Sequence, residues 1–456
     1  MRYVSTRGQT PPESFQDAVL TGLAPDGGLL VPETIPDVSD RLEAWRTLSF
    51  QELALEIISL FCDDIPRTDL KQLIDRAYAG FDHPDVTPLV TVGERQVLEL
   101  WHGPTLAFKD VALQLLGHLF DYILSARGQS LNILGATSGD TGSAAIAGVR
   151  GHHNIHIFIM FPRGRTSHVQ ELQMTTVPDA NVHALSIDGS FDDCQALLKS
   201  TFGDLELKQT MRLGAVNSVN WARVMAQIVY YFHAGLRHRD PVSFAVPTGN
   251  FGDIFAGWLA ARMGLPVKRL ILATNENDIL SVFFNTGIYR RGPVHHTISP
   301  SMDIQVASNF ERYLYYSCGE EPERLRTLMA EFAKSGEIRS EPGDSGVIDP
   351  LIDARAEDTE STLHMIRETW QRHHYLLDPH TAVGVAAAEA VAPGEPVICL
   401  ATAHPAKFPD AVKAAIGEDL AHHPAVDALE GKPVRSVELP ADLAAVKAFI
   451  ETHGIR

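Results

Sequence analysis

The sequence has few cysteines, no long apolar run and fewer positive than negative charges. Only four of its 456 residues are cysteine, and no pair has the CxxC or zinc-ligand spacing. A disulfide framework is not expected in a chain this long, and the pattern fits a reducing compartment, although two long-range disulfides remain compatible with it. The four cysteines are Cys62, Cys194, Cys318 and Cys399.

The other two absences narrow the classes of partner. No stretch approaches the about 20 apolar residues of a membrane span, and the polar start MRYVSTRGQTPPESF lacks the apolar core of a signal peptide. With 38 Lys and Arg against 57 Asp and Glu, the net charge is −19. This excess argues against a nucleic-acid coat or an anionic membrane as the main partner. We expect a cytoplasmic protein, monomer or homodimer, that acts on a small molecule; local donors could still bind an anionic one.

The first 90 residues are predicted to form a mostly helical module. Apolar residues recur at helical spacing in SFQELALEIISLFCDD (49–64), and a second amphipathic stretch covers 68–81. Ser49 and Glu52 have the spacing of a capping box, and Pro66 separates the two helices.

After this module, short apolar runs alternate with helical patterns. Strands are expected at 131–136, 155–161, 182–189, 242–246, 270–274 and 396–402, and a long helix is expected to end at Gly128. The stretch 309–357 is expected to be mostly helical surface structure. Alternation of this kind is typical of parallel α/β sheets covered on both faces, which bind ligands at the carboxyl ends of their strands.

Two of the polar loops that follow strands could bind an anion. PTGNFGD (247–253) precedes a helix, so its free N–H groups could hold a phosphate while Gly249 and Gly252 permit close approach. ATSGDTGSAA (136–145) has the same placement and could hold a carboxylate or a phosphate. Each loop could instead be a structural turn, with Asn250 as a turn former in the first and Asp140 as a helix cap in the second.

Two further segments offer titratable groups. Lys109, in FKD, lies at a helix N-terminus, where the dipole disfavours a cation, and its apolar flank could lower its pKa and make it nucleophilic. The alternative is a surface lysine paired with Asp110. In CLATAHPAKF (399–408), His404 or Lys407 could be catalytic, or His404 could be an ordinary loop histidine. Together, the strand-end loops and the lysine fit pyridoxal 5′-phosphate, which needs a Schiff-base lysine, a phosphate cup and a partner for its ring nitrogen.

The ordered set HGPTLAFKD, GATSGDTGSAA, PTGNFGD and ATAHPAKFPD closely resembles the threonine synthases, in their longer form with an N-terminal module. MRYVSTRG, SFQDAVLTGLAPDGGLLVPE, SVNWAR, SMDI and SNFER resemble the same family. The resemblance implies two α/β domains of the tryptophan synthase β-like (fold type II) architecture around the cofactor. The expected division is an N-terminal module (1–90), a large cofactor-binding domain (91–130 and 215–456) and a small mobile domain (131–214).

The resemblance also implies a role for each motif. Lys109 would carry the cofactor, and Thr402 would hydrogen-bond its ring nitrogen. The phosphate cup would be Gly249, Asn250, Phe251, Gly252 and Asp253. The substrate carboxylate would lie near Ser138, Gly139, Asp140, Thr141 and Gly142. The segment with Asn217, Ser218, Asn220 and Arg223 would approach cofactor or substrate, and Arg163 and Arg165 are candidates for the substrate phosphate.

The implied reaction converts O-phospho-L-homoserine and water to L-threonine and phosphate. The same lysine would also serve a phospho-lyase or another β/γ-eliminase, and a noncatalytic binding protein could keep the fold. The identity of the product separates these alternatives.

Overall fold

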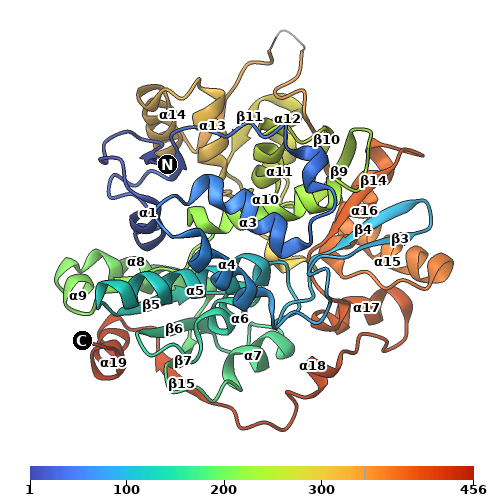
Figure 1. Cartoon of the computed structure of the whole chain (residues 1–456). Coiled ribbons are helices and arrows are strands. Elements are labelled where there is room, and N and C mark those ends of the chain that lie inside the picture. The colour runs from blue at the N-terminus through green and yellow to red at the C-terminus, as the bar shows by residue number, and fades with distance from the viewer. Residues whose placement is uncertain (344–345) are drawn as a thin grey trace.

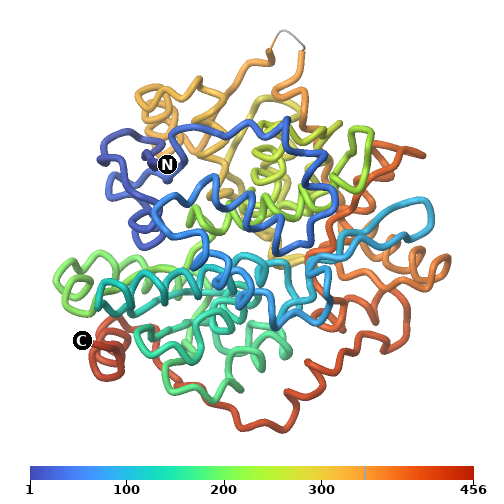
Figure 2. The backbone as a smooth tube through the Cα atoms, viewed as in Figure 1, coloured from blue at the N-terminus to red at the C-terminus, as the bar shows by residue number. Residues whose placement is uncertain are grey.

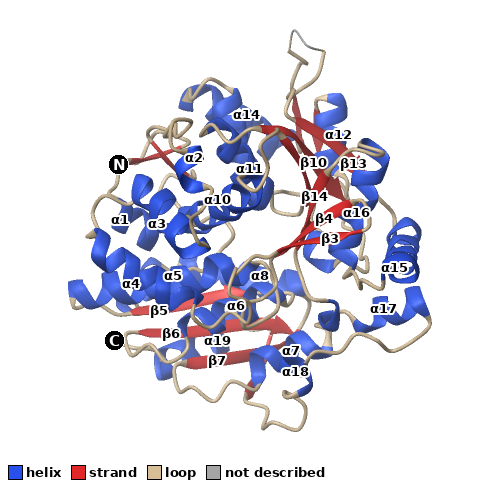
Figure 3. Cartoon of the chain, turned by 45° about the vertical axis from the view of Figure 1, so that its right-hand side comes forward, coloured by secondary structure: helices blue, strands red, loops and turns tan. Residues whose placement is uncertain are grey.

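The computed structural model describes residues 1–343 and 346–456, and its two main sheets lie one above the other in Figure 3. The larger sheet has the order β13-β10-β9-β14-β4-β3 and is parallel except for the β3–β4 hairpin. Its strands are β3 (Leu89–Val92), β4 (Arg95–Glu99), β9 (Val242–Pro247), β10 (Val267–Thr274), β13 (Ile352–Ala356) and β14 (Val397–Ala401).

The smaller sheet has the order β15-β7-β6-β5-β8 and is parallel throughout. Its strands are β5 (Leu131–Ala136), β6 (Ile155–Pro162), β7 (Val182–Asp188), β8 (Leu213–Gly214) and β15 (Ser436–Pro440). The last strand corrects the expected division, which gave the whole of 215–456 to the larger domain. After η2 (Pro405–Lys407), α17 (Pro409–Ile416) and α18 (Pro424–Asp427), the chain returns along the bottom of Figure 2, so that β15 and α19 (Leu443–His453) complete the smaller sheet.

Alternation along the strands explains how both sheets are covered. In the smaller sheet, Ile133, Ile157 and Ile159 share a core with α5 (Lys109–Arg127) and α6 (Asp140–Val149). The intervening Leu134, Phe158 and Met160 belong to a separate core with α8 (Phe191–Gly203) and α19. The larger sheet divides in the same way, between α10 (Trp221–Gly235) with α11 (Gly252–Arg262) and α15 (Thr359–His373) with α16 (Pro379–Val391). Both sheets are therefore buried on two faces, as the continuous apolar runs predicted.

Helices α5 and α6 touch backbone to backbone. A Cβ atom added to Gly117 of α5 would lie 1.8 Å from the carbonyl oxygen of Gly148 in α6, so neither helix tolerates a side chain at this crossing. The contact matters for the site because Lys109 and Asp140 are the first residues of the two helices.

The N-terminal module lies against α10 and α5, in blue in Figure 1. It holds an antiparallel pair of strands, β1 (Tyr3–Ser5) and β2 (Leu30–Pro32), with α1 (Phe15–Thr21) between them in the chain. Three helices follow: α2 (Leu42–Trp45), α3 (Phe50–Phe61) and α4 (Arg67–Tyr78). The capping box at Ser49 and Glu52 is present, and Pro66 precedes α4 as predicted. Residues 1–90 share one continuous apolar core with α5 and α10.

The stretch 309–357 is not mainly the helical surface that the sequence suggested. Helix α13 (Phe310–Ser317) is buried by its aromatic side chains, and β13 is an edge strand of the larger sheet. The remaining elements are α7 (His168–Thr175), α9 (Leu205–Thr210), α12 (Ile279–Thr286), β11 (Ile288–Arg290), η1 (Pro300–Met302), α14 (Pro322–Ser335) and β12 (Glu337–Arg339).

All four cysteines are buried and free, so the sequence-compatible disulfides do not form. In the described ranges no helix is long and apolar enough to cross a membrane.

Candidate active site

Lys109 lies at the N-terminus of α5 with its side chain almost buried. Its Nζ donates a hydrogen bond to Oγ of Ser301 (3.3 Å) and lies 3.9 Å from Oδ2 of Asp140. Burial lowers the pKa of Lys109 to about 8, and Asp140 opposes this shift while the nearby cation Arg223 adds to it. The amine can therefore lose its proton near neutral pH, which a nucleophilic lysine requires. The surface pair with Asp110 does not form, because Asp110 is buried and accepts hydrogen bonds from Thr105.

Asp140 is the centre of a buried polar network at the N-terminus of α6. Its Oδ1 lies 3.1 Å from Nζ of Lys407 and accepts a hydrogen bond from Nε2 of Gln170 (2.8 Å). Burial alone would favour the neutral acid, but the charges of Lys407 and Lys109 outweigh it and hold the pKa of Asp140 well below its usual range. Asp140 is thus a fixed negative charge beside Lys109.

Lys407 is fully buried and occupied by acceptors. Besides Asp140, its ammonium group binds the backbone carbonyl of Thr105 (2.7 Å) and the side-chain oxygen of Gln173. His404, the other candidate in that loop, accepts a hydrogen bond from the N–H of Ala406 and stacks edge-on against Trp101. Burial lowers the pKa of His404 to about 4, so its ring is neutral. Its contacts are those of a loop histidine.

A second chain of contacts leads from Lys109 to Thr402. The N–H of Ser301 donates to Nε2 of His380 (3.2 Å), and Nδ1 of His380 contacts Asp378 (2.9 Å). The same aspartate caps α16 and binds the hydroxyl of Thr381, which accepts from the N–H of Thr402 (3.2 Å). Thr402 is buried, with only 5% of the residue exposed, and yet its hydroxyl forms no hydrogen bond within the described ranges.

Five residues of the site were not predicted from the sequence: Ser301, His380, Asp378, Thr381 and Gln170. Ser301 lies in the SMDI motif, which was noted without a role. The run DPHT (378–381) has the signature of a capped helix start, Asp followed by Pro, but nothing local shows that this cap faces Lys109.

The loop before α11 is held against Ser301. A Cβ atom on Gly249 would lie 2.7 Å from the carbonyl oxygen of Ser301, so the two backbones are in direct contact. Phe251 adopts the left-handed conformation (φ 65°), which is uncommon for a residue with a side chain. Its ring packs between those of Phe284 and Phe310, with ring centroids 5.9 and 5.5 Å away, and this packing holds the left-handed backbone of Phe251 in place. The loop is thus held in one conformation, and it leads directly to the free N–H groups at the N-terminus of α11.

Asp253 faces the interior rather than the loop. Its Oδ1 accepts from the hydroxyl groups of Tyr230 and Tyr231 in α10, while its Oδ2 has no partner in residues 1–343 and 346–456. Burial raises the pKa of Asp253 to about 6 despite the two tyrosine hydroxyls. Asp253 therefore fastens α11 to α10, and only its backbone is available to the loop.

The segment 217–223 lies beside this loop through Asn309. The Nδ2 of Asn309 donates both to the carbonyl oxygen of Ser218 (3.0 Å) and to that of Asn250 (3.2 Å). Asn217 forms a turn by accepting from the N–H groups of Val219 and Asn220. Arg223 is buried and donates from Nη1 to the carbonyl oxygen of Asn217 (2.8 Å), and within the described part of the chain its Nε has no partner.

The second strand-end loop precedes α6. The hydroxyl of Thr137 accepts from the N–H groups of Gly139 and Gly142, each at 3.0 Å, so the loop is closed on itself. Gly139 has φ 155°, and a Cβ atom there would lie 2.4 Å from Gln170. Ser138 is exposed, and the side chains of Ser138 and Thr141 form no hydrogen bond to another described residue.

Arg163 lies outside this network. Its guanidinium group is half-exposed and forms ion pairs with Asp188 (3.0 Å) and Glu438 (2.9 Å), the latter in β15. The sequence could not reveal these partners, because Glu438 is 275 residues away.

Three family models cover most of the chain. "Threonine synthase N terminus" matches residues 2–78, "Pyridoxal-phosphate dependent enzyme" matches 86–348, and "Threonine synthase, C-terminal" matches 381–450. The threonine synthase of Pseudomonas aeruginosa is 48% identical, and the match covers 100% of this chain and 99% of that one. This chain belongs to the threonine synthase family.

Other members of the family agree in sequence and in fold. The threonine synthase of Saccharomyces cerevisiae is 45% identical over 91% of this chain and 89% of its own. The crystal structure of PLP-bound threonine synthase from Brucella melitensis covers 100% of both chains with a TM-score of 0.95 and 46% identity. The Escherichia coli threonine synthase has a TM-score of 0.84 at 35% identity, over 99% of this chain and 100% of that one. The chain is therefore a member of a pyridoxal-phosphate-dependent enzyme family, with the α/β architecture that the sequence predicted.

Proposed function

We propose that this threonine synthase family member converts O-phospho-L-homoserine and water to L-threonine and phosphate, with pyridoxal 5′-phosphate as its cofactor. The observation that carries the proposal is the placement of Lys109. Its amine is nearly buried, has a lowered pKa, and contacts Ser301, whose backbone touches the loop before α11 at Gly249. Family membership over the full length of the chain supports the same activity.

The residues around Lys109 fit the cofactor. Lys109 would bind its aldehyde carbon, and the N–H groups of the Gly249–Gly252 loop at the start of α11 would bind its phosphate. The unpartnered hydroxyl of Thr402 is available for the ring nitrogen. Because a hydroxyl is neutral, it would leave that nitrogen largely unprotonated. When bound, the cofactor withdraws electrons from the α-carbon of an amino acid and so makes its proton removable.

Lys109 then serves as the general base once the substrate amine has replaced it. A free amine with a pKa near 8 can take the α-proton and later return one. Asp140 and Ser301 hold Nζ in place on one side, and the ionised state of Asp140 is secured by Lys407. These contacts orient the base without competing for the proton, since the pKa of Asp140 is far below that of the amine.

The substrate phosphate needs a buried positive charge, and Arg223 fits this better than Arg163. Arg223 is buried beside Lys109 with an N–H group that has no partner among the described residues. An unpaired donor in a buried site costs free energy unless a ligand satisfies it. Asn217 and Ser218 belong to the same turn and can add polar contacts. Arg163 already has two carboxylate partners, so we assign the phosphate to Arg223 instead.

The glycine-rich loop before α6 is proposed to bind the substrate carboxylate. The exposed hydroxyl of Ser138 and the N–H groups at the start of α6 are its donors, and residues Gly139 to Gly142 shape it. Closure of the smaller sheet's domain over the larger would exclude water until the correct step.

Product identification tests the proposed function. Purified holoenzyme should release L-threonine and phosphate in equal amounts from O-phospho-L-homoserine, and Lys109→Ala should release neither. Formation of 2-oxobutyrate in place of threonine would establish a phospho-lyase and overturn the synthase assignment. Failure of the wild-type holoenzyme to release phosphate would overturn both enzyme proposals.

A further inference from the structure

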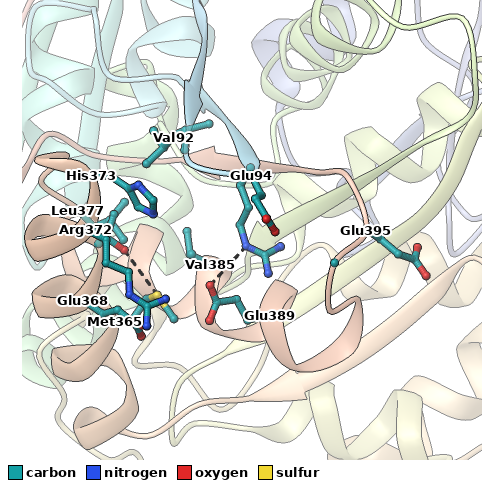
Figure 4. A pocket seen from close by; sticks show the side chains of 14 residues that line it. Val92, Glu94, Met365, Glu368, Arg372, His373, Leu377, Val385, Glu389 and Glu395 are labelled. Atoms are coloured by element: carbon teal, nitrogen blue, oxygen red, sulfur yellow. Dashed lines mark hydrogen bonds and ion pairs between the residues drawn. The ribbon is translucent and has the colours of Figure 1, made fainter.

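A cavity of about 300 Å³ lies where strands β4 and β14 of the larger sheet begin, opposite the strand ends that face the proposed active site. Arg95 and Val97, at the start of β4, line it together with residues of α15 and α16, several of which Figure 4 labels. Glu99, Ala401 and Pro247 end their strands on the Lys109 side, whereas Arg95 begins β4 on the cavity side. This volume is at the lower end of the about 300–1,000 Å³ typical of small-molecule sites.

Arg95 is the unusual residue of this cavity. Its side chain is only 14% exposed, yet within the described ranges its guanidinium group forms no hydrogen bond, and its Nη1 is fully buried without a partner. The nearest carboxylate, that of Glu389, lies 3.6 Å from Nε, beyond hydrogen-bond distance. A nearly buried guanidinium group is costly without partners, so a ligand anion would satisfy it.

The other charges of the cavity show which group a ligand would add. Glu368 is paired with Arg372 (2.7 Å), and Glu395 is paired with Lys268 (2.7 Å) and turned away from the centre in Figure 4. Glu389 is the acidic wall residue of α16, and among the described residues its only ion-pair partner is Arg95, to which it is not hydrogen-bonded. Glu94, an exposed residue between β3 and β4, also lines the cavity. Arg95 and Glu389 thus lie side by side as a cation and an anion that are incompletely satisfied.

Thr369 and His373 are also among the lining residues, which include four buried apolar side chains. Val97, Met365, Leu377 and Val385 face the same space and come from β4, α15, the following loop and α16. We propose that this cavity binds a small α-amino acid with an apolar side chain, its carboxylate on Arg95, its ammonium group on Glu389 and its side chain against these four residues. A guanidinium and a carboxylate a few ångströms apart match the two charges of a zwitterion.

Calorimetric titration of the holoenzyme tests this site. The probes are leucine, isoleucine, valine and methionine, each up to 10 mM, with 4-methylpentanoate and leucinamide as analogues of leucine that lack the amine or the carboxylate. At least one of the four amino acids is expected to bind once per chain. It should bind more than tenfold tighter than the two analogues of it that lack the amine or the carboxylate, which for leucine are 4-methylpentanoate and leucinamide. No heat from any of the four would overturn the proposal, as would an analogue that binds as tightly as its amino acid.

Three variants locate the binding. Arg95→Met keeps the apolar stem and should weaken binding at least tenfold, and Glu389→Gln should weaken it to a similar extent. Arg372→Met is the matched control, because this cation also lines the cavity but already has Glu368; it should change affinity less than twofold. Full affinity in both Arg95→Met and Glu389→Gln would overturn the site.

Binding at Lys109 is distinguishable from binding here. An amino acid that reacts at Lys109 would change the visible absorbance of the cofactor and would still do so in Arg95→Met. Binding in the cavity leaves that spectrum unchanged at saturation, and the spectrum of each variant also reports that it has folded around the cofactor. Threonine formation by the wild type is measured separately, so failure of the cavity proposal leaves the proposed function intact, and the reverse also holds.

Discussion

The carboxylate of Asp140 lies 3.1 Å from the ammonium group of Lys407, and both side chains are almost completely buried. Breaking such a pair leaves an uncompensated charge in the interior. Lys407→Met should therefore lower the free energy of unfolding by about 3–5 kcal/mol. Lys71→Met, which removes an exposed pair on α4, should change it by less than about 0.5 kcal/mol. Urea denaturation of both variants measures the difference; equal stability of the two would show that the buried pair is not ionised.

Cofactor attachment should depend on pH through Lys109. Only the neutral amine attacks an aldehyde, and the pKa of Lys109 is about 8. Attachment to apoenzyme, followed by visible absorbance after mixing, should therefore accelerate as pH rises through about 8 and level off above it.

Asp140→Asn should move this midpoint to lower pH, since the carboxylate favours the charged form of the lysine. Asp75→Asn, which changes an exposed carboxylate of α4, should leave it in place. A midpoint near the ordinary value for lysine in the wild type would contradict the assignment of a desolvated amine.

The loop before α11 should not tolerate a side chain at Gly249. The added methyl group would lie 2.7 Å from the carbonyl oxygen of Ser301, and one of the two backbones must move. Gly249→Ala should release the cofactor on gel filtration at concentrations where the wild type retains it, with Kd raised at least tenfold. Gly203→Ala, at a position with no atom within 4 Å of the new Cβ, is the control. Full retention by Gly249→Ala would exclude this loop as the phosphate cup.

The hydroxyl of Thr402 should affect turnover more than cofactor binding. Thr402→Val keeps the shape and the backbone contacts to Phe108 and Thr381 but removes the donor. We expect the cofactor to be retained and kcat to fall about tenfold, the equivalent of one lost hydrogen bond of about 1.4 kcal/mol. Thr402→Asp should also retain the cofactor with reduced activity, because an acid would protonate the ring. Unchanged kcat in both variants would remove Thr402 from the site.

Arg223 and Arg163 are two candidates for one role, and their environments decide between them. Arg223→Met should raise KM for O-phospho-L-homoserine more than tenfold, because a charged hydrogen bond in a buried site is worth about 1.5–3 kcal/mol. Arg163→Met should alter KM less than twofold, since its exposed pairs with Asp188 and Glu438 contribute little. Steady-state kinetics with both purified variants compares them directly. The reverse order of effects would restore Arg163.

Most of the larger elements were readable from the sequence because their signals are local. The apolar runs of β5, β6 and β9, the cap at Ser49 and the stop at Gly128 each depend on a few neighbouring residues, and all were found. The C-terminal strand β15 was not predicted, and its segment was placed with the larger domain, because its partner, β7, lies about 250 residues earlier. The edge strand β13 was missed because a half-exposed strand lacks a continuous apolar run.

The site followed the same rule. Lys109 and the loop at Gly249 were visible as charge or glycine placed at a helix start. Ser301, His380 and Gln170 were not, because they are far from Lys109 in sequence and reach its surroundings only in the folded chain. Arg163 was a candidate for the substrate phosphate through the family resemblance, but its guanidinium group is paired with Asp188 and Glu438, which no local pattern could place there.

Borohydride reduction followed by peptide mass spectrometry can show whether the amine of Lys109 carries the cofactor. The reduced holoenzyme should carry one pyridoxyl group, on the peptide that contains Lys109. A pyridoxyl group on Lys407 or any other lysine, or none at all after saturation with pyridoxal 5′-phosphate, would contradict the account.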